Sequence, residues 1–232
     1  MYKGKRILAL IPARGGSKGI KNKNIINLNG HPLVSYSIKA AQGSKYIDDI
    51  IVSTDSEEIA NVSRKYGANI PFMRPAELAT DQARSIDVVL HAIKSLDEAE
   101  NYFDILVMLQ CTQPLTRAND IDQAIETFFE KGMSGLVSVS PVEEHPLLMR
   151  KMDKDGTLES LLGENSTCRR QDFKIYYKVN GCIYINQIGE LSSDTSFNDN
   201  PVGFVMDVSH SVDIHEMKDL HLAEYYLHLK EN

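Results

Sequence analysis

The sequence predicts an α/β fold in which helices cover both faces of a mostly parallel β-sheet. Short apolar runs typical of buried strands alternate with longer segments whose apolar residues recur at helical spacing. Residues 105–109 form a continuous apolar run, as expected for a strand that is covered on both faces. Capping residues and glycines between these segments indicate the order of the elements.

Strand and helix are expected to alternate as far as residue 142. Asp55 and Glu58 have the spacing of a capping box, and Ser85 is suited to cap a later helix. Gly67 and Gly132 follow periodic segments, where glycine commonly ends a helix. In chain order we expect a strand at 6–12, a helix at 32–42, a strand at 50–54, helices beginning at Asp55 and Ser85, a strand at 105–109, a helix beginning at Asn119, strands at 135–142, 181–185 and 203–206, and a helix at 216–229.

Residues 142–173 lack a clean period and interrupt this pattern. We therefore expect one domain made of residues 1–141 and 174–232, with the segment 142–173 inserted in it. The insertion is too short to bury its apolar residues in a core of its own, so they suit a partner subunit. A local β-hairpin that covers the sheet edge is the alternative. The apolar residues are Leu147, Leu148, Met149, Leu158, Leu161 and Leu162.

Composition is ordinary for a soluble globular protein. The net charge of −7, with 42% hydrophobic and 25% charged residues, argues against nonspecific nucleic-acid binding. Without an apolar N-terminal segment or a long uncharged apolar run, neither secretion nor a membrane span is expected. Cys111, Cys168 and Cys182 form no Cys-x-x-Cys pair, so we expect free thiols and a reducing, cytoplasmic location.

The most informative motif follows the first expected strand. Residues 11–25 read Ile-Pro-Ala-Arg-Gly-Gly-Ser-Lys-Gly-Ile-Lys-Asn-Lys-Asn-Ile. Glycines allow tight turns that expose backbone N–H groups, and cations at the same place favour a polyphosphate ligand. The spacing fits neither Gly-x-x-x-x-Gly-Lys-Ser/Thr nor Gly-x-Gly-x-x-Gly, so neither a P-loop nor a dinucleotide fold is expected. A solvated basic turn is the alternative.

This motif resembles the first motif of the acylneuraminate cytidylyltransferases, the CMP-sialic acid synthetase family. The resemblance implies a Rossmann-like three-layer nucleotidyltransferase fold with a small dimerisation insertion. It also implies an enzyme that transfers CMP from CTP to the anomeric hydroxyl of a nonulosonic acid, a nine-carbon acidic sugar, and releases pyrophosphate. In this family the segment at 142–173 crosses to a second subunit and completes its site, so a homodimer is expected. Four further segments resemble the family in the same order, at 74–85, 109–117, 169–185 and 211–216.

Within the first motif, the resemblance implies roles residue by residue. Arg14 and Lys23 match the cations that bind the triphosphate, where charge shifts during the transfer. Asn24 falls where the family binds the ribose. Lys18 and Lys21 fit a phosphate role and a solvated loop equally well. The residues expected to line the same pocket are Ala13, Gly15, Gly16 and Ser17.

The second segment, at 74–85, resembles the family's Arg-Pro-x-Glu-Leu-Ala-x-Asp pattern. The resemblance implies that Arg74 donates to the acceptor edge of cytosine, and that the Ala83 carbonyl and Ser85 contact the exocyclic amine and its neighbours. Uracil presents an acceptor where cytosine presents a donor, so this segment is expected to select CTP over UTP.

The third and fourth segments are assigned to the acceptor sugar. Gln110 corresponds to a glutamine that contacts the acidic sugar, and it follows a buried strand. Arg170 and Lys178 match the positions that hold the sugar carboxylate, and Asn180 is expected to shape this part of the site. The family often has arginine in place of Lys178, and lysine lacks its bidentate fork, so the sugar preference can differ.

The fifth segment, at 211–216, departs from the family's Asp-Ile-Asp, whose two carboxylates hold magnesium. Asp213 matches the first carboxylate, whereas His215 replaces the second. Mg²⁺ prefers oxygen ligands, so we expect Asp213 to bind it directly. His215 would contact the metal's water or a phosphate, or serve only the structure. Mg²⁺ is the expected cofactor, with Mn²⁺ as the alternative.

Two other functions fit the same residues. A transferase of this fold for another acidic sugar, such as 3-deoxy-manno-octulosonate, would use similar motifs. A non-catalytic nucleotide-binding module would fit the change at His215, but Arg14 and Lys23 favour catalysis. Pyrophosphate release with CTP and a panel of acidic sugars separates the three.

Overall fold

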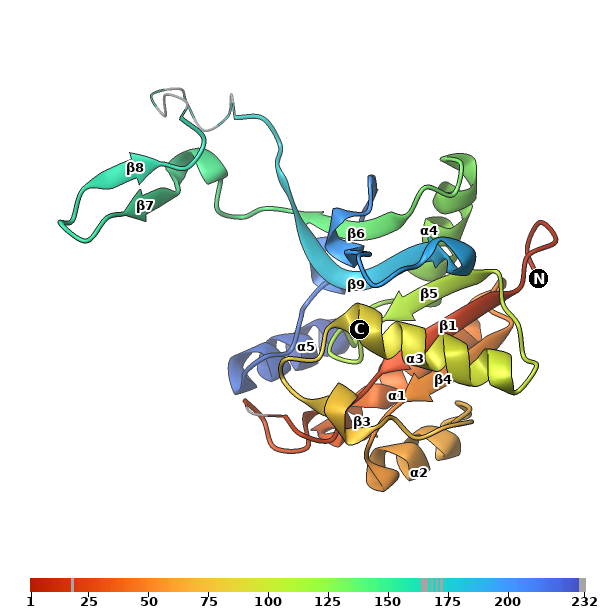
Figure 1. Ribbon diagram of the computed structural model, residues 1–232. Helices are drawn as coiled ribbons and strands as arrows, with labels where there is room; N and C mark the ends of the chain where they lie inside the picture. Colours follow the sequence, from red (N-terminus) through yellow and green to blue (C-terminus); the bar gives the residue numbers. More distant parts are fainter. Residues whose placement is uncertain (18, 164–166, 168, 170, 172, 230–232) are drawn as a thin grey trace.

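In the computed structural model the chain forms a six-stranded sheet between two layers of helices (Figure 1). The structure describes residues 1–232 apart from 18, 164–166, 168, 170, 172 and 230–232. All strand pairs of this sheet are parallel except those that β9 makes with β5 and β6, so the predicted, mostly parallel α/β sheet is confirmed. The strand order is β10 (Val202–Val205), β6 (Leu136–Pro141), β9 (Tyr177–Gln187), β5 (Ile105–Leu109), β1 (Ile7–Pro12) and β4 (Asp49–Ser53).

Alternating side chains of β1 divide the core into two clusters. Ile7, Ala9 and Ile11 face one cluster, and Leu8 and Leu10 face the other. The first cluster also takes residues from α1 (Leu33–Gly43), α2 (Glu57–Lys65), α4 (Ala118–Glu130) and α5 (Met217–Leu229). The second cluster is covered by α3 (Ser85–Glu98). Two small antiparallel pairs stand apart from the main sheet, β2 (Asn27–Leu28) with β3 (His31–Pro32), and β7 (Arg150–Met152) with β8 (Leu158–Ser160).

Two of the predicted helix caps are wrong. Helix α2 is capped by Ser56, whose Oγ accepts the Ile59 N–H, whereas Asp55 accepts an N–H from the loop after β1. Ser85 is the first residue of α3, and the cap position before it is Arg84, without a side-chain cap bond. At Asp55 a tertiary contact overrides the local pattern. At Ser85 the helix begins one residue earlier than the pattern indicated.

The parallel strands bring the polar motifs to one edge of the sheet. Because β1, β4 and β5 run in parallel, the segments that follow Pro12, Ser53 and Leu109 emerge together. The long strand β9 is antiparallel and begins at this edge, next to the end of β6. The same edge therefore receives the glycine-rich loop, the third motif and the insertion.

The insertion extends away from the body as the hairpin β7–β8 (Figure 1). The hairpin pairs with neither edge strand of the six-stranded sheet, β10 or β4. Leu158 and Leu161 are 57% and 58% exposed, whereas Leu147, expected to be exposed, is only 5% exposed. The short turn Pro146–Leu148 places Leu147 inward, which the lack of a period in this segment did not indicate.

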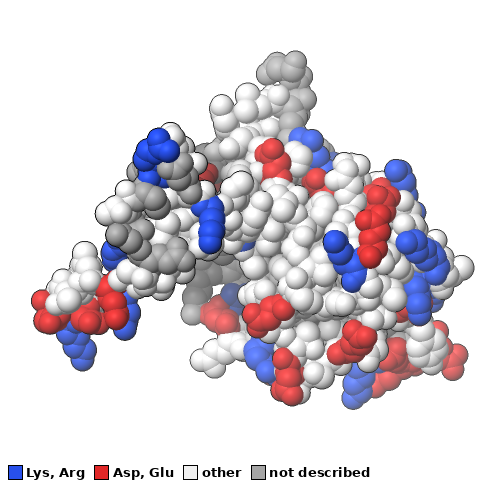
Figure 2. Space-filling model, turned by 90° about the horizontal axis from the view of Figure 1, so that it is seen from above, with Lys and Arg blue, Asp and Glu red and all other residues white. Residues whose placement is uncertain are grey.

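Charge on the face seen from above is mixed, with Lys and Arg interspersed among Asp and Glu (Figure 2). Among the described residues, no helix combines the length and apolar character needed to cross a membrane. Cys111 and Cys182 are buried free cysteines, and Cys168 lies outside the described residues.

Candidate active site

A first cleft of about 560 Å³ lies beyond the ends of β1 and β5. It is lined by segments that are far apart in the sequence, which the parallel strands bring together. Nine residues predicted from the sequence line it: Arg14, Ser17, Lys23, Asn24, Arg74, Ala83, Ser85, Gln110 and His215.

Arg14 and Lys23, the two cations expected at the triphosphate, both lie in the first cleft. The Arg14 guanidinium donates to the Asp81 carboxylate, and Lys23 Nζ donates to the Ile214 carbonyl oxygen at 2.8 Å. Burial lowers the pKa of Lys23, while the nearby Asp213 carboxylate partly opposes this shift. The side chains of the Arg14–Asp81 pair are 31% and 37% exposed, so an anionic ligand can exchange with the carboxylate.

The glycine-rich loop is fixed by contacts with the residues that follow β4. The Gly15 N–H donates to Asp55 Oδ1 at 2.8 Å, and a Cβ at Gly15 would lie 3.0 Å from the Ser56 Cβ. Asn24 is buried and donates from Nδ2 to the Arg14 carbonyl oxygen at 2.9 Å. These bonds shape the loop and engage the Gly15 N–H. Three of the residues expected to line the phosphate pocket do not line the first cleft: Ala13, Gly15 and Gly16.

Arg74 is the buried cation of the first cleft, with 6% of its surface exposed. Its Nε donates to Ser53 Oγ at 3.1 Å, Nη2 donates to the Ser53 carbonyl, and Nη1 lies 3.5 Å from the Leu78 carbonyl. Burial lowers its pKa to about 10, so it is charged at neutral pH. A guanidinium has five N–H donors, so two have no partner among the described residues. These two donors are available to acceptor atoms of a ligand.

A second cleft of about 490 Å³ adjoins the first, and Ser85 and Gln110 line both. Its other walls come from Arg84 and the largely polar loop at residues 193–198, together with the apolar side chains of Ile86 and Met108. Tyr184, which also lines it, donates its hydroxyl to Asn198 Oδ1 at 3.0 Å, and burial raises its pKa to about 12. Two adjoining clefts with a shared wall can hold two substrates side by side.

Asn180 lies on an irregular stretch of β9, where the pairing with β6 shifts register. Its Oδ1 accepts the Ser138 hydroxyl at 2.6 Å, and its carbonyl oxygen accepts Gln113 Nε2 at 2.6 Å. Its Nδ2 is buried and has no hydrogen-bond partner in the described part of the chain. An unpaired buried donor is unfavourable, so a ligand acceptor at this atom would stabilise it. Asn180 lines neither cleft, and its role at the sugar stays a prediction.

Asp213 and His215 lie together, with His215 Nε2 2.8 Å from Asp213 Oδ2. Asp213 Oδ1 is buried and has no hydrogen-bond partner among the described residues. Those residues include no group of three or more His, Cys, Asp or Glu side chains placed to hold a metal ion. Mg²⁺ commonly binds through one or two carboxylates together with substrate phosphates. Asp213 itself lines neither cleft, whereas its neighbour His215 lines the first. The unpartnered Asp213 oxygen has the chemistry of a ligand for a cation that arrives with a triphosphate.

The remaining predicted residues lie apart from the clefts or outside the described residues. Lys178 is exposed on β9, opposite Ser140, and lines neither cleft. Lys21 is exposed, whereas Lys18 and Arg170 lie outside the described residues.

Sequence reasoning missed two parts of the site. Asp81, which lines the first cleft, stands in the motif at 74–85, so its position there was the available signal. The loop at 193–198 reads Ser-Asp-Thr-Ser-Phe-Asn and has neither a period nor a recognised motif. Only the fold brings this loop to the second cleft.

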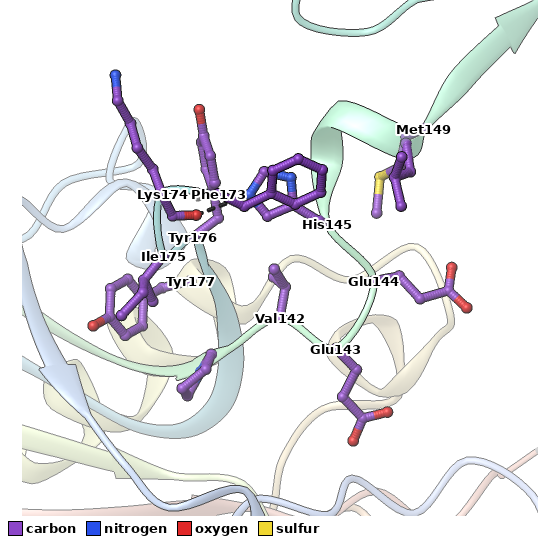
Figure 3. A pocket seen from close by; sticks show the side chains of 12 residues that line it. Val142, Glu143, Glu144, His145, Met149, Phe173, Lys174, Ile175, Tyr176 and Tyr177 are labelled. Atoms are coloured by element: carbon purple, nitrogen blue, oxygen red, sulfur yellow. Dashed lines mark hydrogen bonds between the residues drawn. The ribbon is translucent and has the colours of Figure 1, made fainter. Parts of the chain in front are cut away.

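A third hollow, of about 740 Å³, lies at the base of the insertion (Figure 3). The ring of His145 lies against Phe173 with centroids 4.3 Å apart, and Tyr176 meets it nearly edge-on at 5.0 Å. His145 Nε2 donates to the Lys174 carbonyl oxygen at 2.8 Å, the dashed bond of Figure 3. Ile175 lines the same hollow and is 72% exposed. The base of the insertion is thus ordered around His145, with apolar surface beside it.

A family model described as cytidylyltransferase matches residues 8–228, which include both clefts and the insertion. The chain belongs to the cytidylyltransferase family. It is therefore a nucleotidyltransferase, and the resemblance identified from the five motifs is confirmed.

Relatives and solved structures agree with this membership. A CMP-N,N'-diacetyllegionaminic acid synthase of Legionella pneumophila is 36% identical, over 97% of this chain and 98% of its own. An N-acylneuraminate cytidylyltransferase of Streptococcus agalactiae is 33% identical, over 97% of this chain and 55% of its own. A CMP:2-keto-3-deoxy-manno-octonic acid synthetase, solved with CTP, covers 98% of this chain and all of its own with a TM-score of 0.72. At 15% identity, that structure shows the common fold alone.

Proposed function

We propose that this cytidylyltransferase transfers CMP from CTP to the anomeric hydroxyl of a nonulosonic acid, a nine-carbon acidic sugar of the sialic type. The observation that carries the proposal is the pair of adjoining clefts, one with Arg14, Lys23 and Arg74, the other with a polar loop. CTP would occupy the first cleft and the sugar the second. Ser85 and Gln110 stand at the junction, where the two substrates would meet.

The chemistry needs positioning and charge stabilisation more than a covalent nucleophile. The sugar hydroxyl attacks the α-phosphorus of CTP, the bond to the bridging oxygen breaks, and pyrophosphate leaves. Negative charge moves onto the leaving phosphates, where Arg14 and Lys23 can stabilise it. Arg74, which lines the same cleft, would donate to the cytosine acceptor edge.

Asp213 is the residue that would hold a divalent cation, through the oxygen that has no protein partner in the described part of the chain. Mg²⁺ bound there would neutralise charge on the phosphates. His215 would contact water bound to the metal or keep the Asp213 carboxylate oriented through its 2.8 Å contact.

The acceptor class is drawn from the relatives and from the second cleft. The relatives named for N,N'-diacetyllegionaminic acid and for N-acylneuraminate match at 36% and 33% identity, and both names are those of nine-carbon acids. Hydroxyl and amide side chains at 193–198 suit the hydroxyl and acylamino groups of such a sugar. The related octulosonate reading is supported only by the fold.

The proposal includes a homodimer formed through the insertion. The exposed Leu158 and Leu161 and the hollow of Figure 3 offer apolar surface that a second copy would cover. Lys178 lines neither cleft of its own subunit, so it would reach a sugar carboxylate only in a neighbouring subunit's site.

The test is pyrophosphate release from the purified chain with CTP or UTP and a panel of acidic sugars. The panel holds N,N'-diacetyllegionaminic acid, N-acetylneuraminic acid and 3-deoxy-manno-octulosonate. We expect release with CTP and a nine-carbon acid, and little with UTP. Preference for the octulosonate would overturn the acceptor class, and CTP binding without release would favour a binding module.

A further inference from the structure

The loop at residues 191–199, called the acceptor loop below, forms one wall of the second cleft and is anchored unevenly. Its C-terminal half is fixed by Phe197, which is 5% exposed in the core under α3, and by the bond from the Tyr184 hydroxyl to Asn198. Its N-terminal half is exposed at Ser192, Ser193 and Asp194. The bonds within that half are local, such as Thr195 N–H to the Ser192 carbonyl at 3.0 Å.

Arg84 supplies the missing anchor. Its Nη1 donates to the Ser193 carbonyl oxygen at 3.1 Å. Among the hydrogen bonds of the described residues, this is the one that joins positions 192–196 to another element. The two residues are 109 positions apart, so the bond closes the wall between α3 and the acceptor loop.

The Arg84 side chain is itself held in a fixed orientation. Nε and Nη2 donate to the two carboxylate oxygens of Asp87, at 2.9 and 2.6 Å, in a bidentate pair. Such a pair fixes the plane of the guanidinium, which leaves Nη1 pointing at the loop. Because Arg84 is 59% exposed, this pair adds little to the stability of the fold, and its effect is on where the loop sits.

We propose that Arg84 is a positioning residue for the acceptor sugar. By holding the acceptor loop in place, Arg84 keeps the second cleft at the width that a nine-carbon acid needs. This inference rests on the proposed function. Arg84 lies between Ala83 and Ser85, at the end of the segment expected to read the base. One side chain therefore ties the wall of the nucleotide cleft to the wall of the acceptor cleft. The polar groups of Ser193, Thr195 and Ser196 depend on this tie for their placement.

The first measurement is hydrogen exchange of amides 192–196 in the protein without substrates. We expect faster exchange in Arg84→Ala, and also in Arg84→Lys, because one ammonium cannot replace the fork that binds Asp87 and Ser193 together. Asp87→Asn, which weakens the fork and keeps the donor, should fall between these variants and the wild type. The matched control is Arg64→Ala, which removes an exposed arginine that is paired with Glu57 on α2 and lines neither cleft.

The second measurement separates the KM values for the two substrates. Arg84→Ala should raise the KM for the nine-carbon acid by roughly tenfold, since small misplacement of a substrate has large effects, and leave the KM for CTP within about twofold. It should also narrow the preference for nine-carbon over eight-carbon acids. Unchanged exchange in Arg84→Ala, or an equal rise in both KM values, overturns the inference. The hydrogen-exchange measurement needs no substrate. It therefore tests whether Arg84 anchors the acceptor loop even if the wild type turns over no sugar and the proposed function fails.

Discussion

The first cleft and the insertion are built in opposite ways. In the cleft, polar groups find partners in the same chain: Arg74 binds Ser53, Lys23 binds the Ile214 carbonyl, and Asp55 binds the loop at Gly15. In the insertion, β7 and β8 pair only with each other among the residues that the structure describes, and most of the apolar side chains between 148 and 162 are exposed. A sheet edge can organise a charged site within one subunit. A two-stranded hairpin cannot bury apolar surface without a larger body against it.

The largest expected effect is on assembly, from the double variant Leu158→Asp with Leu161→Asp. Each side chain buried at an interface contributes about 1.5–3 kcal/mol, so the pair contributes roughly 3–6 kcal/mol in each subunit. Both subunits of the proposed homodimer lose this contribution, roughly 6–12 kcal/mol in total, so its dissociation constant should rise by at least about 10⁴-fold. Light scattering across a dilution series measures this shift.

The control for the double variant is Lys154→Asp, which adds an acid at an exposed position of the same hairpin. It should leave the dimer intact. A wild type that is monomeric at all concentrations and fully active would contradict the contrast between the cleft and the insertion, because the insertion would then need no partner.

The next effect is on turnover, from Arg14→Ala and Lys23→Ala. Each variant removes a cation where charge develops, so kcat should fall about 10²- to 10³-fold at saturating CTP. Both side chains are partly exposed, so the melting temperature should change little. Near-normal rates in both variants would mean that the triphosphate does not bind at Arg14 and Lys23.

Lys23 also predicts a pH dependence. Burial lowers its pKa, so the charged form is lost at lower pH than in an ordinary lysine. The kcat/KM for CTP should therefore decline on the alkaline side before the usual lysine range. Lys23→Arg should move this decline to higher pH, since arginine keeps its proton.

The comparison also explains what the sequence could predict. Strands such as Ile105–Leu109 and helices such as Ala118–Glu130 carry their patterns locally, and they form where expected. The cap at Asp55 was wrong because the Gly15 N–H, 40 positions away, takes its carboxylate. Local spacing contains no information about such a competitor.

The same limit applies within the site. Arg14, Lys23 and Arg74 belong to motifs with recognisable spacing, and the fold brings them to one cleft. The acceptor loop carries no motif, and its contact with Arg84 joins positions 109 residues apart. Residues that act through such contacts become visible only when the chain is folded.

A smaller effect is expected at the metal, from Asp213→Asn. Replacing the carboxylate that carries the free oxygen should weaken the apparent Mg²⁺ affinity about 10- to 100-fold. His215→Asp adds a second carboxylate beside it, so Mg²⁺ should bind more tightly, or the preference for Mn²⁺ should fall. A Mg²⁺ titration of the rate measures both.

His221→Asp is the matched control, because it adds the same carboxylate at an exposed histidine of α5. It should leave the titration unchanged. Identical titrations in the wild type, Asp213→Asn and His215→Asp would place the metal elsewhere in the molecule.

The smallest effect concerns Asp81, the carboxylate that pairs with Arg14 across the first cleft. A triphosphate must compete with this carboxylate for the guanidinium, and the two anions repel each other. Exposed ion pairs contribute roughly 0.2–1 kcal/mol, so Asp81→Asn should tighten the binding of inorganic tripolyphosphate by about twofold to fivefold. Titration calorimetry without CTP isolates the phosphate wall from the base.

Glu77→Gln removes the same charge from an exposed side chain of the neighbouring turn Ala76–Ala79 and separates pairing from overall charge. If the direct pair with Arg14 matters, Glu77→Gln should change the affinity much less than Asp81→Asn does. Equal gains in the two variants would mean that only net charge counts. Weaker binding in Asp81→Asn would mean that the carboxylate holds Arg14 ready for the phosphates. In that case even the carboxylate that competes with the phosphates would support the site, and the contrast between the self-contained cleft and the insertion would be sharper.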